Sequence, residues 1–120
     1  MNPPVADLLE RLSSAIHDQD LSAGLELWCD DAVLAGSDEA ELALGNEIRD
    51  FLAMTMSLGV RLRWEWQEPV VRQDGPVAWF FAEGQLCVED TKPRPYRCSG
   101  VAREEQGRWR LALWHGAQPA

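Results

Sequence analysis

The sequence predicts an α+β domain in which three helices from the first half pack on one face of a curved antiparallel sheet from the second half. Before Gly59, apolar residues recur at the helical period. From Val60 onward they alternate with polar residues at the period of a strand. Helices packed on one face of such a sheet leave an aromatic-lined hollow between the layers.

The first expected helix runs from about Pro3 to Asp18, and Asp20 is placed to cap a second, short one. The second helix should end near the Asp30-Asp31 pair. The buried stripes consist of Val5, Leu8, Leu9, Leu12 and Ile16 in the first helix and Leu21, Leu25 and Trp28 in the second.

A short strand at Val33 and Leu34 and an acid-rich connection from Gly36 to Gly45 precede the third helix. That helix is expected to start at Asn46 and stop at Gly59. The four long strands that follow are expected at Val60–Gln67, Val77–Glu89, Tyr96–Glu104 and Arg108–His115.

Composition limits the possible functions. A chain of 120 residues fits one domain, covering residues 1–120. Its net charge of -9 repels phosphate backbones and anionic membranes, so neither nucleic acid nor a membrane is an expected partner. The sequence has no signal-peptide pattern and no apolar span long enough to cross a membrane, so a cytoplasmic location is expected.

Cofactor and metal chemistry have little support in the sequence. The cysteines Cys29, Cys87 and Cys98 lack zinc-ligand spacing and are expected as small buried hydrophobes. Only His17 and His115 are available, so no metal site is expected. No phosphate loop, nucleophile elbow or dinucleotide fingerprint is present, and no cofactor is expected.

Three stretches carry a family resemblance: Leu27–Val33, Gly36–Ile48 with its Asp38 and Glu41, and Tyr96–His115. In their order along the chain and in their local sequence, they resemble the SnoaL-like group of the nuclear transport factor 2-like (ketosteroid isomerase-like) superfamily. The resemblance implies a cone of bent sheet closed by three helices. Similar proteins include polyketide cyclases, ketosteroid isomerases, dehydratases, dioxygenase small subunits and noncatalytic association domains. In the enzymes, an acid and a polar partner project into the cone and move a proton on an apolar ligand. The similar sequences often have a second histidine where Leu113 stands and a tryptophan where Gly116 stands.

Three residues are the candidate catalytic groups. Glu83 interrupts an apolar strand and would have a raised pKa if it faced inward; alternatively it faces water or pairs with Arg97 or Arg103. His115 shares the parity of Trp109 and could shuttle a proton, or it could fix the last strand through a hydrogen bond. By resemblance, the connection holding Asp38 runs near the cone mouth.

Asp38 and its neighbour Glu41 also have structural interpretations. Asp38 could form a turn, and Glu41 could act as a cap partner. Arg97 matches an arginine position in the similar sequences. It could clamp a substrate carboxylate or enolate, or it could neutralise Glu83.

Tryptophans are the candidate ligand wall, because rigid aromatic rings can stack on a planar ligand. Core packing is the alternative interpretation of each one. Trp28 is assigned to the buried stripe of the second helix. Trp114 alternates with His115 and is therefore assigned to a contact with another subunit. The tryptophans proposed to bind ligand are Trp64, Trp66, Trp79 and Trp109.

The sequence therefore favours a cone that binds an apolar small molecule. The enzymatic hypothesis is a cofactor-free isomerase, cyclase or dehydratase that acts by proton transfer next to a carbonyl. The alternative is a noncatalytic ligand-binding or association domain. A homodimer through the outer sheet face is expected in either case, on the basis of the resemblance and the apolar Ala112 and Trp114.

Overall fold

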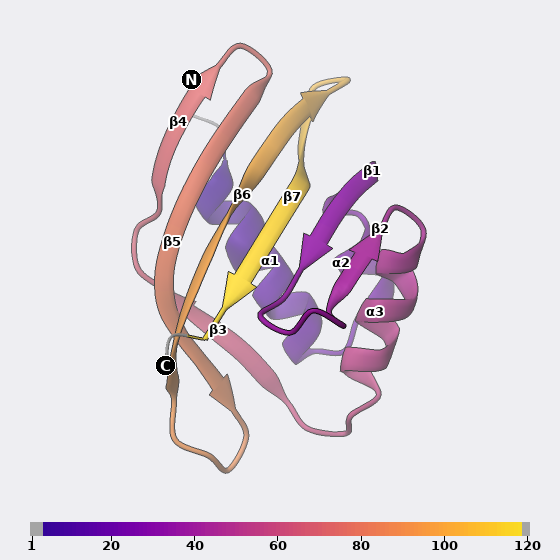
Figure 1. Ribbon diagram of the computed structural model, residues 1–120, viewed down its shortest axis with the longest axis vertical. Helices are drawn as coiled ribbons and strands as arrows, with labels where there is room; N and C mark the ends of the chain where they lie inside the picture. Colours follow the sequence, from indigo (N-terminus) through magenta and orange to yellow (C-terminus); the bar gives the residue numbers. More distant parts are fainter. Residues whose placement is uncertain (1–3, 119–120) are drawn as a thin grey trace.

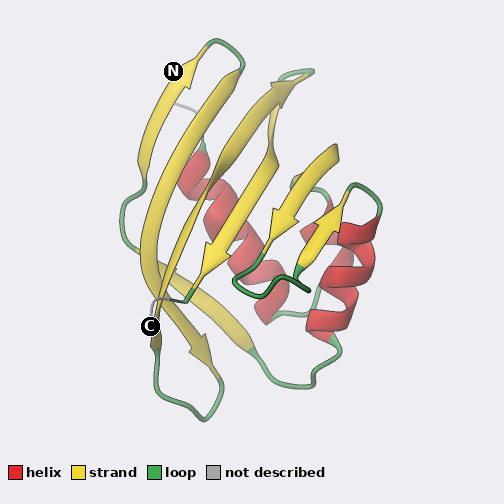
Figure 2. Ribbon diagram, in the orientation of Figure 1, coloured by secondary structure: helices red, strands yellow, loops and turns green. Residues whose placement is uncertain are grey.

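A bent sheet with helices on one side forms the whole described structure. The computed structural model describes residues 4–118, and this range contains three helices and seven strands. The long first helix passes behind the sheet and the third helix lies beside its short edge strand, while the near face of the sheet carries no helix (Figures 1 and 2). The helices are α1 (Val5–His17), α2 (Leu21–Leu25) and α3 (Glu47–Met56). The strands are β1 (Trp28–Ala35), β2 (Leu42–Leu44), β3 (Leu62–Trp66), β4 (Val70–Asp74), β5 (Val77–Val88), β6 (Arg94–Glu105) and β7 (Arg108–Ala117).

The long strand β5 makes the sheet bend. The strand order is β2-β1-β7-β6-β5-β3, and β4 also pairs with β5. The first part of β5, Val77–Phe81, pairs with β4, whereas its second part, Gly84–Val88, pairs with β3. Only the β1–β7 pair is parallel among the described strands. The strands therefore wrap around the helices, and the predicted α+β cone is confirmed.

The helices follow the apolar stripes of the sequence. The buried side of α1 includes the expected leucines and Ile16, while Pro3 lies outside the described residues. The expected cap of α2 is confirmed, because Asp20 accepts a hydrogen bond from the N–H of Ala23 at 3.1 Å. Asn46 makes no such bond at α3. There, Glu47 accepts one from the N–H of Leu44 at 2.9 Å.

Three parts of the sheet differ from the prediction. Strand β1 begins at Trp28, which therefore belongs to a strand and not to a helix stripe. Strand β2 lies inside the acidic connection and is held by pairing with β1, as in Val33 opposite Leu44. Strand β4 follows Pro69 and is mostly polar, as edge strands often are.

The core fills the space between the helices and the inner sheet face. Its fully buried side chains include Leu8 and Leu9 from α1, Ile48 and Leu52 from α3, and Leu111 from β7. Burial of this apolar surface is the main force that holds the layers together. Within residues 4–118, no helix is both long and apolar enough to cross a membrane.

Candidate functional site

An apolar cavity lies inside the cone, between the helices and the inner face of the sheet. Its volume is about 170 Å³. Aromatic and aliphatic side chains dominate its walls, and Glu41 and Tyr96 are the ionisable residues among them. The lining consists of Leu12, Ile16, Trp28, Leu34, Ala35, Gly36, Glu41, Phe51, Leu52, Thr55, Leu62, Trp64, Leu86, Tyr96, Trp114 and Gln118.

Four aromatic rings meet at one wall of this cavity. Trp64 and Trp66 point to the same side of β3 and stack with their centroids 6.1 Å apart. Trp114 meets both of them edge to face at 6.0 Å, and Tyr96 lies 5.7 Å from Trp64. Offset and edge-to-face pairs of this kind are the favoured arrangements of aromatic side chains. These mutual contacts restrict the movement of the four rings.

A β-bulge places Trp114 in this wall. In the β6–β7 ladder, Ala102 pairs with Leu111 but Val101 pairs with Leu113, so Ala112 is an extra residue. The side-chain parity of β7 reverses at this point. Trp114 is consequently buried, with 4% of its surface exposed, whereas His115 lies on the exposed outer face. The prediction that His115 faces the cone and Trp114 a partner is wrong for this reason.

Tyr96 supplies a hydrogen-bonding group inside the cavity. Burial raises the pKa of its hydroxyl to about 12, although a hydrogen bond from the Trp114 indole opposes this rise. The nearby carboxylate of Glu41 adds to the increase in this pKa. At neutral pH the hydroxyl is therefore protonated. Because its oxygen accepts from Trp114, the hydroxyl can donate its hydrogen to a ligand.

Glu41 is held in place by the loop that joins β1 to β2. Its Oε1 accepts a hydrogen bond from the N–H of Asp38 at 3.1 Å. The backbone is closed by the N–H of Gly36, which donates to the Glu41 carbonyl at 2.7 Å. A side chain at position 36 would collide with the Glu41 carboxylate, 2.8 Å from its Oε2. The turn therefore holds Glu41 at the cavity through one carboxylate oxygen, Oε1, and makes no hydrogen bond to the other.

Glu83 and Arg97 do not reach the cavity. They face each other across β5 and β6 on the outer face, with Arg97 Nε 3.4 Å from Glu83 Oε2. Arg97 also lies over the ring of Phe81, 4.9 Å from its centroid. The inward position that a catalytic Glu83 would require is not found, and the alternative pairing with Arg97 is confirmed. The cause is the alternation of side chains along β5: Glu83 lies on the same face as the exposed Trp79, whereas Ala82 faces the core.

The other expected site residues divide between the cavity and the surface. Trp64 lines the cavity, and Trp66 packs behind it in the aromatic wall. Trp79 is 48% exposed on the outer face, and Trp109 packs against the core away from the cavity lining. Asp38 forms a turn by accepting a hydrogen bond from the N–H of Ala40 at 2.9 Å, which confirms its structural interpretation.

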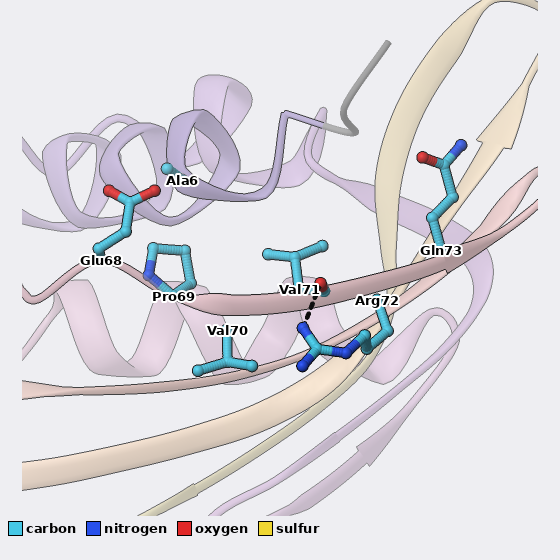
Figure 3. Close-up of a pocket in the computed structure, with 7 residues that line it drawn as sticks. All are labelled: Ala6, Glu68, Pro69, Val70, Val71, Arg72 and Gln73. Atoms are coloured by element: carbon cyan, nitrogen blue, oxygen red, sulfur yellow. Dashed lines mark hydrogen bonds between the residues drawn. The ribbon is translucent and has the colours of Figure 1, made fainter.

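A second, larger hollow lies at the edge of the sheet (Figure 3). It measures about 580 Å³ and runs between the start of α1, at Ala6, and the segment from Glu68 to Gln73. One guanidinium N–H of Arg72 donates to the carbonyl of Val71 at 3.1 Å, so this side chain covers part of the strand edge. Because the hollow contains no aromatic side chain and no converging acid and donor, the inner cavity is the better candidate site.

The sequence interpretation missed Tyr96 and Trp114 for different reasons. Tyr96 is the only tyrosine of the chain and shares parity with the small residues Cys98, Gly100 and Ala102, which is a readable signal for an inward position. Trp114 gave no such signal, because the bulge at Ala112 depends on pairing with a distant strand. Glu41 was placed with Asp38 in the connection that the resemblance puts near the cone mouth, but it was interpreted as a cap partner and not selected as a catalytic candidate.

The comparisons agree with this architecture. The profile of the SnoaL-like domain matches residues 5–120. The chain belongs to the SnoaL-like domain family. No match was found among curated proteins.

Solved structures similar to this SnoaL-like protein share its fold at low identity. An NTF2-like protein of unknown function from Pseudomonas putida KT2440 superposes with a TM-score of 0.84 at 20% identity, covering 97% of this chain and 84% of that one. A provisionally assigned dehydratase of the NTF2-like family from Streptomyces avermitilis gives 0.81 at 13%, covering 98% and 99%. A provisionally assigned calcium/calmodulin-dependent protein kinase type II association domain from Thiobacillus denitrificans gives 0.78 at 19%, covering 100% and 98%. These likenesses establish the fold alone.

Proposed function

We propose that this SnoaL-like protein binds a small apolar carbonyl compound and moves a proton on it without a cofactor, as an isomerase, cyclase or dehydratase does. One observation carries the proposal: the Glu41 carboxylate and the protonated hydroxyl of Tyr96 line the same apolar cavity. An acid–base group and a hydrogen-bond donor in a desolvated pocket are what enolate chemistry needs.

In the proposed reaction, the Glu41 carboxylate takes a proton from the carbon next to the carbonyl. The electron pair of that C–H bond forms the carbon–carbon double bond of an enolate, and the carbonyl electrons move onto oxygen. Tyr96 donates a hydrogen bond to this oxygen and stabilises its charge. In an isomerase, whose substrate also carries a carbon–carbon double bond one carbon beyond the enolate, Glu41 then returns the proton to the far carbon of the resulting dienolate and the carbonyl re-forms. In a dehydratase, the enolate electrons re-form the carbonyl and make a carbon–carbon double bond, while the β-hydroxyl takes the proton from Glu41 and leaves as water.

The surroundings of Glu41 suit this role. The Asp38 N–H fixes one carboxylate oxygen and so restricts the rotation of the side chain. The lining of the cavity includes Trp28, Leu34, Phe51 and Trp64, which surround the reacting groups with apolar surface. A solved structure of the same fold is provisionally assigned as a dehydratase. Dehydration beside a carbonyl begins with the same proton removal.

Exchange of α-protons for deuterium tests the step common to all three reactions. We expect the protein to accelerate exchange at the α-carbons of cyclohexanone in D2O, followed by NMR. Glu41→Gln keeps the turn contact but removes the base, and should lower the protein-dependent rate by at least about 100-fold. Tyr96→Phe should lower it by about 100-fold, because it removes an oxyanion donor.

Glu39→Gln is the matched control, because Glu39 lies exposed in the same loop and does not line the cavity. His115→Ala and Glu83→Gln on the outer face should also leave the exchange rate unchanged. Exchange by Glu41→Gln as fast as in the unmodified protein would contradict the proposal.

A noncatalytic association domain is the second candidate, and the uncovered sheet face favours it. Leu42, Leu44, Val70, Trp79 and Leu113 expose between 37% and 54% of their surface there. Exposed apolar patches on soluble proteins often mark interfaces. A protein that forms a stable dimer but never accelerates exchange would fit this second function.

A further inference from the structure

We propose, building on the proposed function, that the cavity selects a neutral, flat compound of a single ring whose oxygen accepts a hydrogen bond from Tyr96. We further infer that Gly116 is the specificity-determining residue, because it leaves the space in which the Tyr96 hydroxyl sits.

The size of the cavity limits the part of a ligand that it can surround. Its volume is about 170 Å³. A buried apolar cavity of roughly 150 Å³ in another protein binds benzene, so this cavity holds a single six-membered ring with a small substituent. A fused two-ring compound exceeds this volume, so part of it would have to remain outside the cavity, because the close contacts among Trp64, Trp66 and Trp114 oppose movement of the aromatic wall.

The walls favour a flat ligand without a negative charge. The side chains of Trp28, Trp64 and Trp114 offer ring surfaces against which a planar molecule can pack. Among the lining residues that the structure describes, Glu41 is the one carboxylic acid, and none is Lys, Arg or His. An anion would therefore be repelled in a weakly screened space and would find no positive charge in compensation.

A cation is a less suitable ligand than a neutral acceptor. It would gain from Glu41 and from the ring faces. However, the Trp114 indole nitrogen and the Tyr96 hydroxyl lie close together beside Gly116, and the indole N–H on the phenol oxygen favours an arrangement in which the hydroxyl presents its hydrogen to the ligand. A hydrogen-bond donor facing a positive charge is unsatisfied and repelled, whereas a carbonyl oxygen satisfies it.

Gly116 provides the place for this hydroxyl. Gly116 is buried on β7, two residues beyond Trp114 and on the same inner face. A Cβ at position 116 would overlap the Tyr96 hydroxyl and lie 2.8 Å from Trp114 Nε1. Every other L-residue would therefore displace the hydroxyl, the indole or both. Gly116 acts on the ligand through Tyr96 and is a positioning residue.

Calorimetric titration with four matched probes and one larger one tests the proposal. Benzaldehyde has one ring and a neutral acceptor, toluene lacks the acceptor, benzoate is an anion, tetramethylammonium is a cation and 1-naphthaldehyde has two rings. We expect benzaldehyde to bind about 10-fold more tightly than toluene, the value of about one net hydrogen bond. Benzoate, tetramethylammonium and 1-naphthaldehyde should bind more weakly than benzaldehyde.

Two variants assign the preference to the hydroxyl and to its position. Tyr96→Phe should remove the advantage of benzaldehyde over toluene while leaving the affinity for toluene within about 2-fold, because only the hydrogen bond is lost. Gly116→Ala should reduce the same ratio toward one. Gly24→Ala is the control: its added Cβ meets its nearest neighbour at an ordinary 3.6 Å, and the ratio should not change. If Gly116→Ala does not fold, Tyr96→Phe alone decides.

Equal affinities for benzaldehyde and toluene, or tighter binding of the anion, the cation or the two-ring aldehyde, would overturn the proposal. So would a ratio that Tyr96→Phe leaves unchanged. Binding is measured without turnover, and the two proposals therefore fail separately. Normal selectivity without Glu41-dependent deuterium exchange rejects catalysis and keeps the ligand class.

Discussion

Tyr96 and Cys98 are consecutive inward-facing residues of β6, and burial is the main cause that raises the pKa of each to about 12. Their ordinary values are 10.0 for the phenol and 9.0 for the thiol. The folded state therefore favours the neutral forms. This contribution to stability is complete below the ordinary values, and it is lost as the pH rises from about 9 toward 12.

The free energy of unfolding should consequently fall on the alkaline side. Each group contributes a slope of up to about 1.4 kcal/mol per pH unit while it is ionised only in the unfolded chain. Urea denaturation at pH 8, 10 and 11 measures the decrease. Tyr96→Phe should make the decrease between pH 10 and 11 shallower, and stability that does not depend on pH in this range would contradict the prediction.

At the scale of secondary structure elements, strong local periodicity was predictable and pairing-dependent features were not. The alternation through Trp64 and Trp66 identifies β3, and the apolar stripe of α1 identifies that helix. Strand β2 is only three residues long and lies among glycines and acids, so its pairing with β1 alone defines it. The predicted site was wrong for the same reason, because strand pairing decides which way its residues face. One bulge reversed the orientations of Trp114 and His115, and a misjudged face moved Glu83 and Arg97 outside.

The effect of the bulge at Ala112 on the orientation of β7 side chains can be tested by deletion. Deleting Ala112 alone would restore regular alternation in β7 and keep Trp114 inward, opposite Gly100. Deleting Ala112 and Leu113 together would turn Trp114 outward and His115 inward. Because burial of a tryptophan is then lost and a histidine is forced into the core, we expect the double deletion to cost at least about 3 kcal/mol in unfolding free energy. Chemical denaturation monitored by tryptophan fluorescence measures this change. Deleting Ala112 alone is the control and should cost far less, and a double-deletion variant as stable as the unmodified protein would contradict the prediction.

For the whole molecule, strand register organises the apolar residues of the outer face into a row. Leu44 lies opposite Val33, Val33 opposite Leu113, Leu113 opposite Val101, and Val101 opposite Trp79. The row thus crosses five neighbouring strands on the face without helices. Trp114, expected on this face from the sequence, lies in the core, and Leu113 takes its place on the surface.

Such a row suits a second copy of the chain, because a two-fold axis brings the same apolar strip of both copies together. We therefore propose a homodimer through this face, and expect light scattering at micromolar concentration to report twice the chain mass. Leu113→Glu places a charge in the middle of the row and should give a monomer with an intact fold. Leu58→Glu is the matched control: Leu58 is 64% exposed but follows α3, away from the sheet face, and its substitution should leave the dimer unchanged. A monomeric unmodified protein would contradict the interface, and so would a dimer that Leu113→Glu does not weaken, because no other described face combines this many exposed apolar side chains on adjoining strands.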